Sequence, residues 1–257
     1  MKKLQLVGFC LFCLVGCTST ATQAPQQAVS NQQTAANLPN PTADTAPKQM
    51  VRSQPADLND LNSVTTLPSV QLAYASTANF TGAKVPGYQA NRCYLQQKAA
   101  DALVKVAVQA QRLGYRLQLL DCYRPHRASG HFMRWVDNAR DHSTKAAYYP
   151  NLQKNTLKQG YIAEFSGHSR GSTLDLTLLR KDASGQWTAV DMGGGYDLFD
   201  PVSHLNSTTI NAQQKANRLL LKDLMQQQGF LPYALEWWHF TLADEAYPAT
   251  YFDFTVN

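Results

Sequence analysis

Hydrophobic residues recur along this chain with the two periods that mark helices and strands. Over residues 94–112 they repeat on one helical face, and Gly114 follows where such a helix would end, so this segment predicts a helix. A second helix is predicted from a cap at Asn211 to about residue 228, before a glycine. A shorter helix is expected over residues 131–136.

Three other segments alternate apolar and polar residues with the strand period, and these are residues 115–121, 173–179 and 237–242. Arg124 and Pro125 follow the first segment and interrupt regular structure there. Helices mixed with short strands that hairpins can join predict an α+β fold. We expect its sheet to be mainly antiparallel and flanked by helices.

The strand predicted at residues 173–179 carries leucines on one face and polar residues on the other. Leu174, Leu176 and Leu178 can anchor this strand in the core, while Asp175 points the opposite way into a cleft. Beginning the last predicted strand at residue 237 leaves Glu236 in the preceding loop.

The first residues of the chain have the features of a targeting signal. Lys2 and Lys3 precede the apolar run 4–16, which is too short to cross a bilayer of about 30 Å. The run ends in Leu-Val-Gly-Cys, typical of a lipoprotein processing box in which Cys17 is acylated. An ordinary signal peptide or a short anchor is the alternative. We expect a lipoprotein signal at residues 1–17 and a protein lipid-anchored in the bacterial cell envelope, on the periplasmic side of the inner or outer membrane.

The remaining chain falls into two parts of different composition. Residues 18–55 are rich in Ala, Thr, Gln, Pro, Asn and Ser, and carry charge only at Asp44, Lys48 and Arg52. Such a segment buries too little apolar surface to offset the entropy lost on ordering. We therefore expect a disordered tether at 18–55 and one globular domain at 56–257.

Charge and cysteine content restrict the partners and the compartment. The 257-residue chain has a net charge of +5 without a dense run of lysine or arginine, so we expect no nucleic-acid partner. Outside the predicted signal and its lipidated cysteine, the domain keeps Cys93 and Cys122. Two such cysteines often pair in an oxidising compartment, which predicts a disulfide; two separate buried thiols are the alternative.

Two short segments carry the candidate chemistry. His168 and Asp175 are seven residues apart in a turn-and-strand segment, and Glu236 and His239 are three apart between tryptophans. Two histidines and an aspartate form a ligand set for catalytic zinc that leaves one position open for water. A glutamate that does not bind the metal can act as the base. If either of these two segments is considered alone, the alternative is a structural or surface histidine beside a solvated carboxylate.

Other polar residues give weaker indications. Ser166 lacks the GxSxG surroundings of a serine nucleophile, and Arg124 alone would usually be a surface residue. Beside a hydrolytic zinc site, however, such a cation can stabilise a developing oxyanion. The histidines without a partner at ligand spacing, expected on the surface or in loops, are His126, His131, His142 and His204.

With these segments in place, the chain resembles the zinc D-alanyl-D-alanine dipeptidases of the vancomycin-resistance type. The resemblance runs from about Leu72 to Val256. It consists of several blocks in the same order, which argues against chance: 74–82, 121–125, 160–161, 166–178, 192–197, 236–240 and 247–254. It implies a Hedgehog/DD-peptidase-like zinc peptidase fold and one Zn²⁺ per chain.

The resemblance also implies a role for each matching side chain. The implied zinc ligands are His168, Asp175 and His239. Glu236 is implied to activate water and later to protonate the leaving amine, and Arg124 to stabilise the tetrahedral intermediate. For the substrate, Asp197 and Tyr74 are implied to hold the free ammonium of the dipeptide, and Ser166 to place its C-terminal carboxylate.

We therefore expect zinc-dependent hydrolysis of free D-alanyl-D-alanine to two D-alanines, in cell-wall peptide turnover or in glycopeptide resistance. The alternatives are a zinc D,D- or L,D-carboxypeptidase acting on peptidoglycan stem peptides, and a non-catalytic zinc-containing domain that binds the wall. The chain departs from the family pattern at Thr173, where a small residue such as alanine is usual. It also departs in its expected lipoprotein signal and tether, which cytoplasmic relatives lack.

Overall fold

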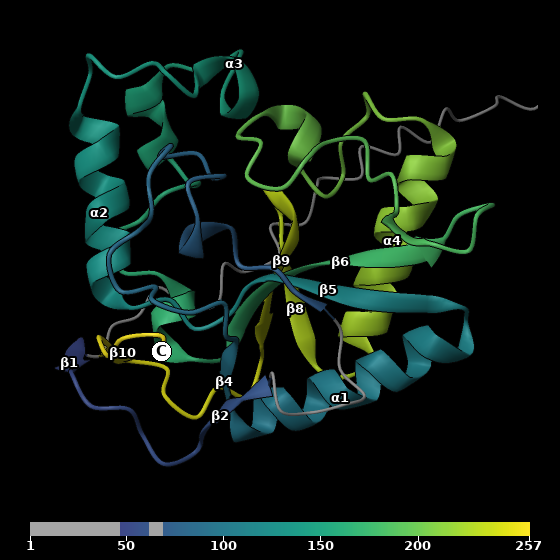
Figure 1. Ribbon diagram of the computed structural model, residues 1–257, viewed down its shortest axis with the longest axis horizontal. Helices are drawn as coiled ribbons and strands as arrows, with labels where there is room; N and C mark the ends of the chain where they lie inside the picture. The colour runs from purple at the N-terminus through teal and green to yellow at the C-terminus, as the bar shows by residue number, and fades with distance from the viewer. Residues whose placement is uncertain (1–46, 62–68) are drawn as a thin grey trace, which may run out of the picture. The chain divides into compact units, whose positions relative to one another are not determined.

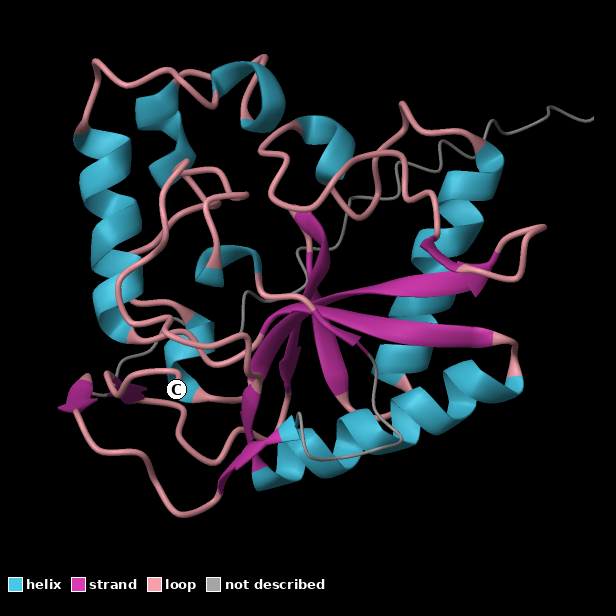
Figure 2. Ribbon diagram, in the orientation of Figure 1, coloured by secondary structure: helices cyan, strands magenta, loops and turns pink. Residues whose placement is uncertain are grey.

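A six-stranded sheet organises the part of the chain that the computed structural model describes, residues 47–61 and 69–257 (Figures 1 and 2). Its central path runs β3–β5–β6–β9–β8, and β7 pairs with β6. The strands are β3 Ser69–Val70, β5 Tyr115–Asp121, β6 Thr173–Lys181, β7 Trp187–Ala189, β8 Phe230–Tyr233 and β9 Glu236–Leu242. β3 pairs parallel with β5, and the other pairings of this sheet are antiparallel. The α+β class predicted from the sequence is confirmed.

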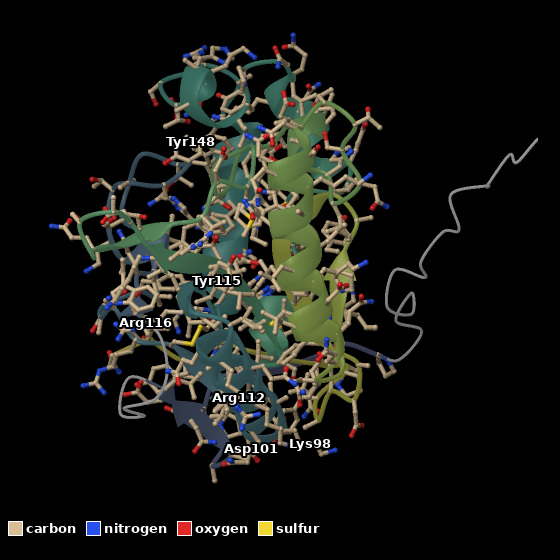
Figure 3. The ribbon with its side chains drawn as sticks, turned by 90° about the vertical axis from the view of Figure 1, so that its right-hand side faces the viewer. Lys98, Asp101, Arg112, Tyr115, Arg116 and Tyr148 are labelled. Carbon is tan, nitrogen blue, oxygen red and sulfur yellow. A yellow bond between two sulfur atoms is a disulfide. The ribbon has the colours of Figure 1, made fainter. Side chains whose placement is uncertain are left out.

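Two long helices pack against this sheet. α1 (Gln97–Arg112) contacts β5, and α4 (Ala212–Gln226) contacts β8 and β9. Figure 3 looks onto α4 and shows Lys98, Asp101 and Arg112 of α1 at the surface. The polar face of α1 therefore meets solvent, while its apolar face covers the sheet.

Shorter elements complete the fold, and the longest of them follows the C-terminal end of β5. α2 (His126–Asp137) begins after the chain leaves β5, and Figure 1 shows it well apart from α1 and α4. The remaining helical elements are η2 Ala73–Ala75, α3 Lys145–Tyr148, η3 Lys154–Lys158, η4 Gly167–Arg170 and η5 Pro201–Ser203. Two small ladders join β1 (Gln49–Val51) to β10 (Thr250–Phe252) and β2 (Leu58–Asp60) to β4 (Tyr94–Gln96).

The leucines of β6 form the buried layer that the sequence predicted. Leu176 lies opposite Leu119 of β5, and Leu178 lies opposite Leu117, so the apolar side chains of both strands share one face. All four are at most 1% exposed. This layer fixes the register, because a slip of one residue would turn the leucines away from the core.

Several element boundaries differ from the sequence prediction, and three of the differences have a clear physical reason or bear on the site. The helix predicted from residue 94 begins at Gln97, because the three preceding residues pair with β2 and the Gln96 side chain caps the helix by accepting from the Lys98 backbone N–H. The helix predicted at 131–136 extends over all of α2. The placement of Glu236 in a loop was wrong: β9 begins at Glu236, which lies opposite Tyr233 across a tight hairpin.

The last residues of the predicted tether are part of a sheet ladder. β1, at residues 49–51, runs parallel to β10 with Met50 opposite Tyr251. The predicted signal, Cys17 and residues 18–46 lie outside the described residues. Within the two described ranges, none of the helices combines the length and apolar character needed to cross a membrane.

Cys93 and Cys122 form a disulfide in the structure, with their Cα atoms 5.3 Å apart. Cys93 precedes β4, and Cys122 follows directly after β5. Both residues are fully buried. The bond therefore ties together the two ends of the segment that contains α1 and β5.

Candidate metal centre and active site

The sheet register brings residues from three strands into one row. Asp175 of β6 lies opposite His239 of β9 on one side and opposite Asp121 of β5 on the other. Directly opposed residues on neighbouring strands point to the same face, so these polar side chains lie together on the face away from the leucines. The cluster thus follows from strand pairing among residues distant in sequence.

His168 reaches the same place from the short helix η4 just before β6. Gly171 ends η4 with a φ of +84°, a left-handed conformation that glycine adopts without steric cost. A Cβ at this position would lie 2.9 Å from a methyl carbon of Leu58. The tight turn explains how seven residues of sequence bring His168 next to Asp175.

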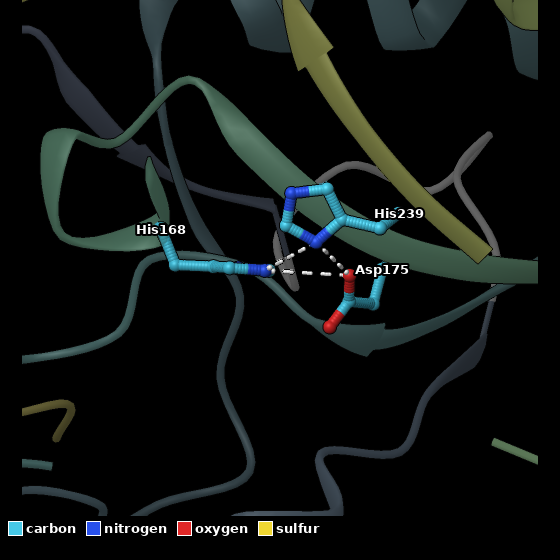
Figure 4. A group of neighbouring side chains, drawn as sticks. All are labelled: His168, Asp175 and His239. Carbon is cyan, nitrogen blue, oxygen red and sulfur yellow. Dashed lines mark hydrogen bonds and ion pairs between the residues drawn. The ribbon is translucent and has the colours of Figure 1, made fainter. Parts of the chain in front are cut away.

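The side chains of His168, Asp175 and His239 converge on one point (Figure 4). Asp175 Oδ1 lies 3.3 Å from His168 Nε2 and 3.0 Å from His239 Nδ1, and the two ring nitrogens are 3.3 Å apart. Ligands held tetrahedrally at about 2.0–2.1 Å from zinc are themselves separated by about 3.3 Å. The three atoms therefore have the spacing of one face of a tetrahedral site.

The hydrogen bond made by His168 is consistent with a metal ligand. Its Nδ1 lies 2.7 Å from the carbonyl oxygen of Cys122. Because a carbonyl only accepts, Nδ1 carries the hydrogen, and Nε2 presents a lone pair to the cluster. Asp175 Oδ1 is buried and lacks a well-aligned hydrogen bond from any described residue. Facing lone pairs of this kind fit a bound cation.

The pKa of Asp175 reflects two opposing effects. Burial acts to raise the pKa of this carboxyl, but His168 and His239 beside it hold the pKa below its ordinary value. Its second oxygen, Oδ2, accepts a hydrogen bond from Tyr196 Oη at 3.0 Å. Asp175 is thus an ionised candidate ligand, with one oxygen held by Tyr196 and the other turned to the two histidines.

Glu236 and Arg124 flank the cluster. Glu236 Oε2 lies 3.6 Å from His239 Nδ1, and burial, followed by the charges of Asp175 and Asp197, raises the pKa of Glu236 well above its usual range. Arg124 Nη2 lies 3.8 Å from Asp175 Oδ2. A carboxyl with a raised pKa suits proton transfer, and an arginine beside it suits a developing negative charge.

Asp121 is a site residue that sequence reasoning did not single out. It is fully buried, accepts from Tyr88 Oη at 2.7 Å and from Arg124 Nε at 2.9 Å, and so fixes the direction of the guanidinium. The sequence contained a usable signal, because Asp121 ends a strand three residues before Arg124.

The predicted substrate-binding residues lie around the same centre. Asp197 is buried, has a φ of +58° and accepts from Tyr74 Oη with distances of 3.1 and 3.0 Å to its two oxygens. A non-glycine residue in this left-handed region is strained, and such strain often occurs at binding sites. Ser166 Oγ accepts from the His168 backbone N–H at 3.3 Å and lies 3.5 Å from Arg124 Nη1.

A cavity of about 460 Å³ joins these groups. Every predicted catalytic, metal and substrate residue lines it, namely Tyr74, Arg124, Ser166, His168, Asp175, Asp197, Glu236 and His239. The four weaker histidines do not line it; His204, for example, pairs with Tyr161 Oη at 2.8 Å. A cavity of this volume, with few convergent polar groups, suits a small ligand.

Comparison with known sequences places the chain in a family. The model of the D-Ala-D-Ala dipeptidases, peptidase family M15, matches residues 54–257. The chain belongs to this family. M15 peptidases are metal-dependent hydrolases, and the His168–Asp175–His239 cluster supplies a candidate metal site in this member.

Individual members of the M15 family are similar over most of their length. A D-alanyl-D-alanine dipeptidase of Streptomyces coelicolor is 45% identical over 184 residues, covering 71% of this chain and 90% of that protein. One from Enterococcus faecium is 43% identical over 185 residues, which cover 72% of this chain and 90% of that protein. One from Escherichia coli K12 is 34% identical over 197 residues, which cover 76% of this chain and 90% of that protein.

Proposed function

We propose that this protein is a D-alanyl-D-alanine dipeptidase of the vancomycin-resistance type, which hydrolyses the free dipeptide to two molecules of D-alanine. Family membership and the dipeptidase names of the relatives support this function. The observation that carries it is the meeting, in one cavity, of a three-ligand cluster with Glu236 and Arg124.

His168, Asp175 and His239 hold the metal, which we propose to be zinc because two imidazoles and a carboxylate are a donor set that zinc accepts. Zinc bound there polarises a carbonyl and lowers the pKa of a water molecule. Two hydrogen bonds orient these ligands: Tyr196 donates to Asp175, and His168 donates to the Cys122 carbonyl oxygen.

Glu236 performs the proton transfers of the reaction. Its carboxylate takes a proton from the attacking water, and the carbon–nitrogen bond of the dipeptide then breaks as Glu236 returns that proton to the leaving nitrogen. Arg124 donates to the oxyanion that forms on the scissile carbonyl. The hydrogen bond from Arg124 to Asp121 keeps the guanidinium in place before the substrate arrives.

The two ends of the dipeptide are bound by different groups. Asp197, which accepts a hydrogen bond from Tyr74, binds the free ammonium. Burial and the nearby charge of Asp175 raise the pKa of Asp197. A cationic partner such as the ammonium counters that rise in pKa. Ser166 places the C-terminal carboxylate. An acylated amine would leave Asp197 buried without its partner, so the site should prefer free dipeptides.

The envelope location is part of the proposal. We infer a lipoprotein with acylated Cys17, a tether and a periplasmic catalytic domain of the Hedgehog/DD-peptidase-like zinc peptidase fold. The Cys93–Cys122 disulfide supports an oxidising compartment. Outside the inner membrane, the substrate would be D-alanyl-D-alanine released during wall turnover.

The test is D-alanine release by the purified signal-free domain from free D-alanyl-D-alanine and from its N-acylated form, each with and without a chelator. We expect chelator-sensitive cleavage of the free dipeptide alone. Cleavage of the acylated peptide would favour the carboxypeptidase, and absence of release from a metal-loaded protein would contradict the dipeptidase.

A further inference from the structure

Lys48 lies in the wall of the active-site cavity, although it precedes the region that the family model matches. Its Nζ is 4.1 Å from the centre of the Phe165 ring and 6.0 Å from that of Tyr251. The two rings pack edge to face, with centroids 5.0 Å apart. The aromatic pair therefore holds a lysine ammonium at the cavity.

The backbone of Lys48 is fixed by the ladder that follows it. Gln49 N–H donates to the Ala249 carbonyl at 2.9 Å, and β1 then runs beside β10 with Met50 opposite Tyr251. Anchoring by main-chain pairing on one side and by two rings on the other limits where the ammonium can go. A cation that is positioned before binding loses less entropy on meeting an anion.

Lys48 differs from the other cations that line the cavity, because each of those has a carboxylate partner. Arg124 pairs with Asp121, Lys158 with Asp137, and Arg170 with Glu245 through two hydrogen bonds of 2.8 and 2.7 Å. Within residues 47–61 and 69–257, Lys48 Nζ contacts aromatic rings and forms no ion pair with a carboxylate. Its charge is thus available to an anionic group of a ligand.

The neighbours of Lys48 indicate which end of a ligand it would meet. Phe165, the ring closest to its ammonium, directly precedes Ser166, the residue assigned to the C-terminal carboxylate. Asp197, which is assigned to the opposite end, is held instead by Tyr74. A zwitterionic dipeptide needs an anion for its ammonium and a cation for its carboxylate, and the cavity offers both.

We propose that Lys48 is a specificity-determining residue that binds the C-terminal carboxylate of the dipeptide substrate together with Ser166. This role rests on the proposed dipeptidase function. The N-terminal segment thereby completes the substrate site. It would select peptides with a free C-terminal carboxylate, as Asp197 selects those with a free amine.

The experiment compares D-alanyl-D-alanine with its C-terminal amide, as substrates or as competitive inhibitors, using the full chain. We expect Lys48→Gln and Lys48→Met to raise KM for the dipeptide about 5- to 10-fold with kcat within about twofold, the size of a charged hydrogen bond reduced by solvent screening. The amide should bind equally well to wild type and to both variants. Lys48→Arg should restore much of the preference for the acid.

Lys181→Gln is the matched control. Lys181 also holds its ammonium over an aromatic ring, at 5.7 Å from the centre of Trp187, but it does not line the cavity. The Lys181→Gln substitution should leave KM for the dipeptide and the binding of its amide unchanged. An unchanged KM in the Lys48 variants, or an equal loss for acid and amide, would overturn the role of Lys48. Failure of the wild type to cleave the dipeptide at all would instead overturn the proposed function.

Discussion

Replacing both Cys93 and Cys122 by alanine should destabilise the domain by an amount that follows from its topology. The two residues are 29 positions apart, and their bond closes a loop containing α1 and β5. Loop-closure entropy for that length is about 12 cal/mol/K, or about 3.6 kcal/mol at 25 °C. For a domain of this size, the loss corresponds to a fall in Tm of roughly 7–14 °C.

Alanine is preferable to serine here, because both positions are fully buried and a hydroxyl would lack a partner. The assay is urea unfolding of metal-saturated wild type and double variant, since bound metal itself stabilises the folded state. A reductant should lower the stability of the wild type by a similar amount and leave the variant unchanged. Equal stabilities within about 1 kcal/mol, well below the loop-closure value, would refute the reasoning.

Four further outcomes are expected. Glu236→Gln should retain metal, measured by atomic absorption, and lose about 10²- to 10⁴-fold in kcat; a fully active variant would remove Glu236 as the base. His239→Ala should lose bound metal, and an unchanged metal content would exclude it as a ligand. Asp197→Asn should narrow the preference for free over N-acylated dipeptide, read from the ratio of kcat/KM values. Burial lowers the pKa of His131, so the folded state binds fewer protons than the unfolded state. Stability should therefore fall as the pH drops through about 6.5, and His131→Gln should show a smaller fall in urea unfolding.

Local sequence patterns predicted the elements whose apolar period or capping residue lies within the segment itself. The strand at 115–121 has the predicted bounds, and the helix capped at Asn211 forms with a reciprocal capping box to Gln214. The start of the 94–112 helix was missed because Tyr94, Leu95 and Gln96 pair with β2, and a distant strand can override helical periodicity. Nothing within that segment signals its partner.

The candidate site shows the same division. The residue types and spacings of His168, Asp175, Glu236 and His239 are sufficient to indicate metal-assisted hydrolysis, because that chemistry needs this set of donors and a base. The contribution of Asp121 was missed, because its function depends on lying opposite Asp175 and beside Arg124. The position of Lys48 also escaped the sequence, where its surroundings have the composition of a tether.

By itself, the sequence determined the α+β class, the chemistry of the cluster and the family resemblance, because periodicity and residue type are properties of short segments. Only the tertiary structure decided that two strands and a short helix bring two histidines and an aspartate within 3.3 Å of one another. It also placed Lys48, Arg124 and Asp197 around a single cavity. The physical reason is that strand register and burial depend on contacts between residues far apart in the chain, which no local pattern encodes.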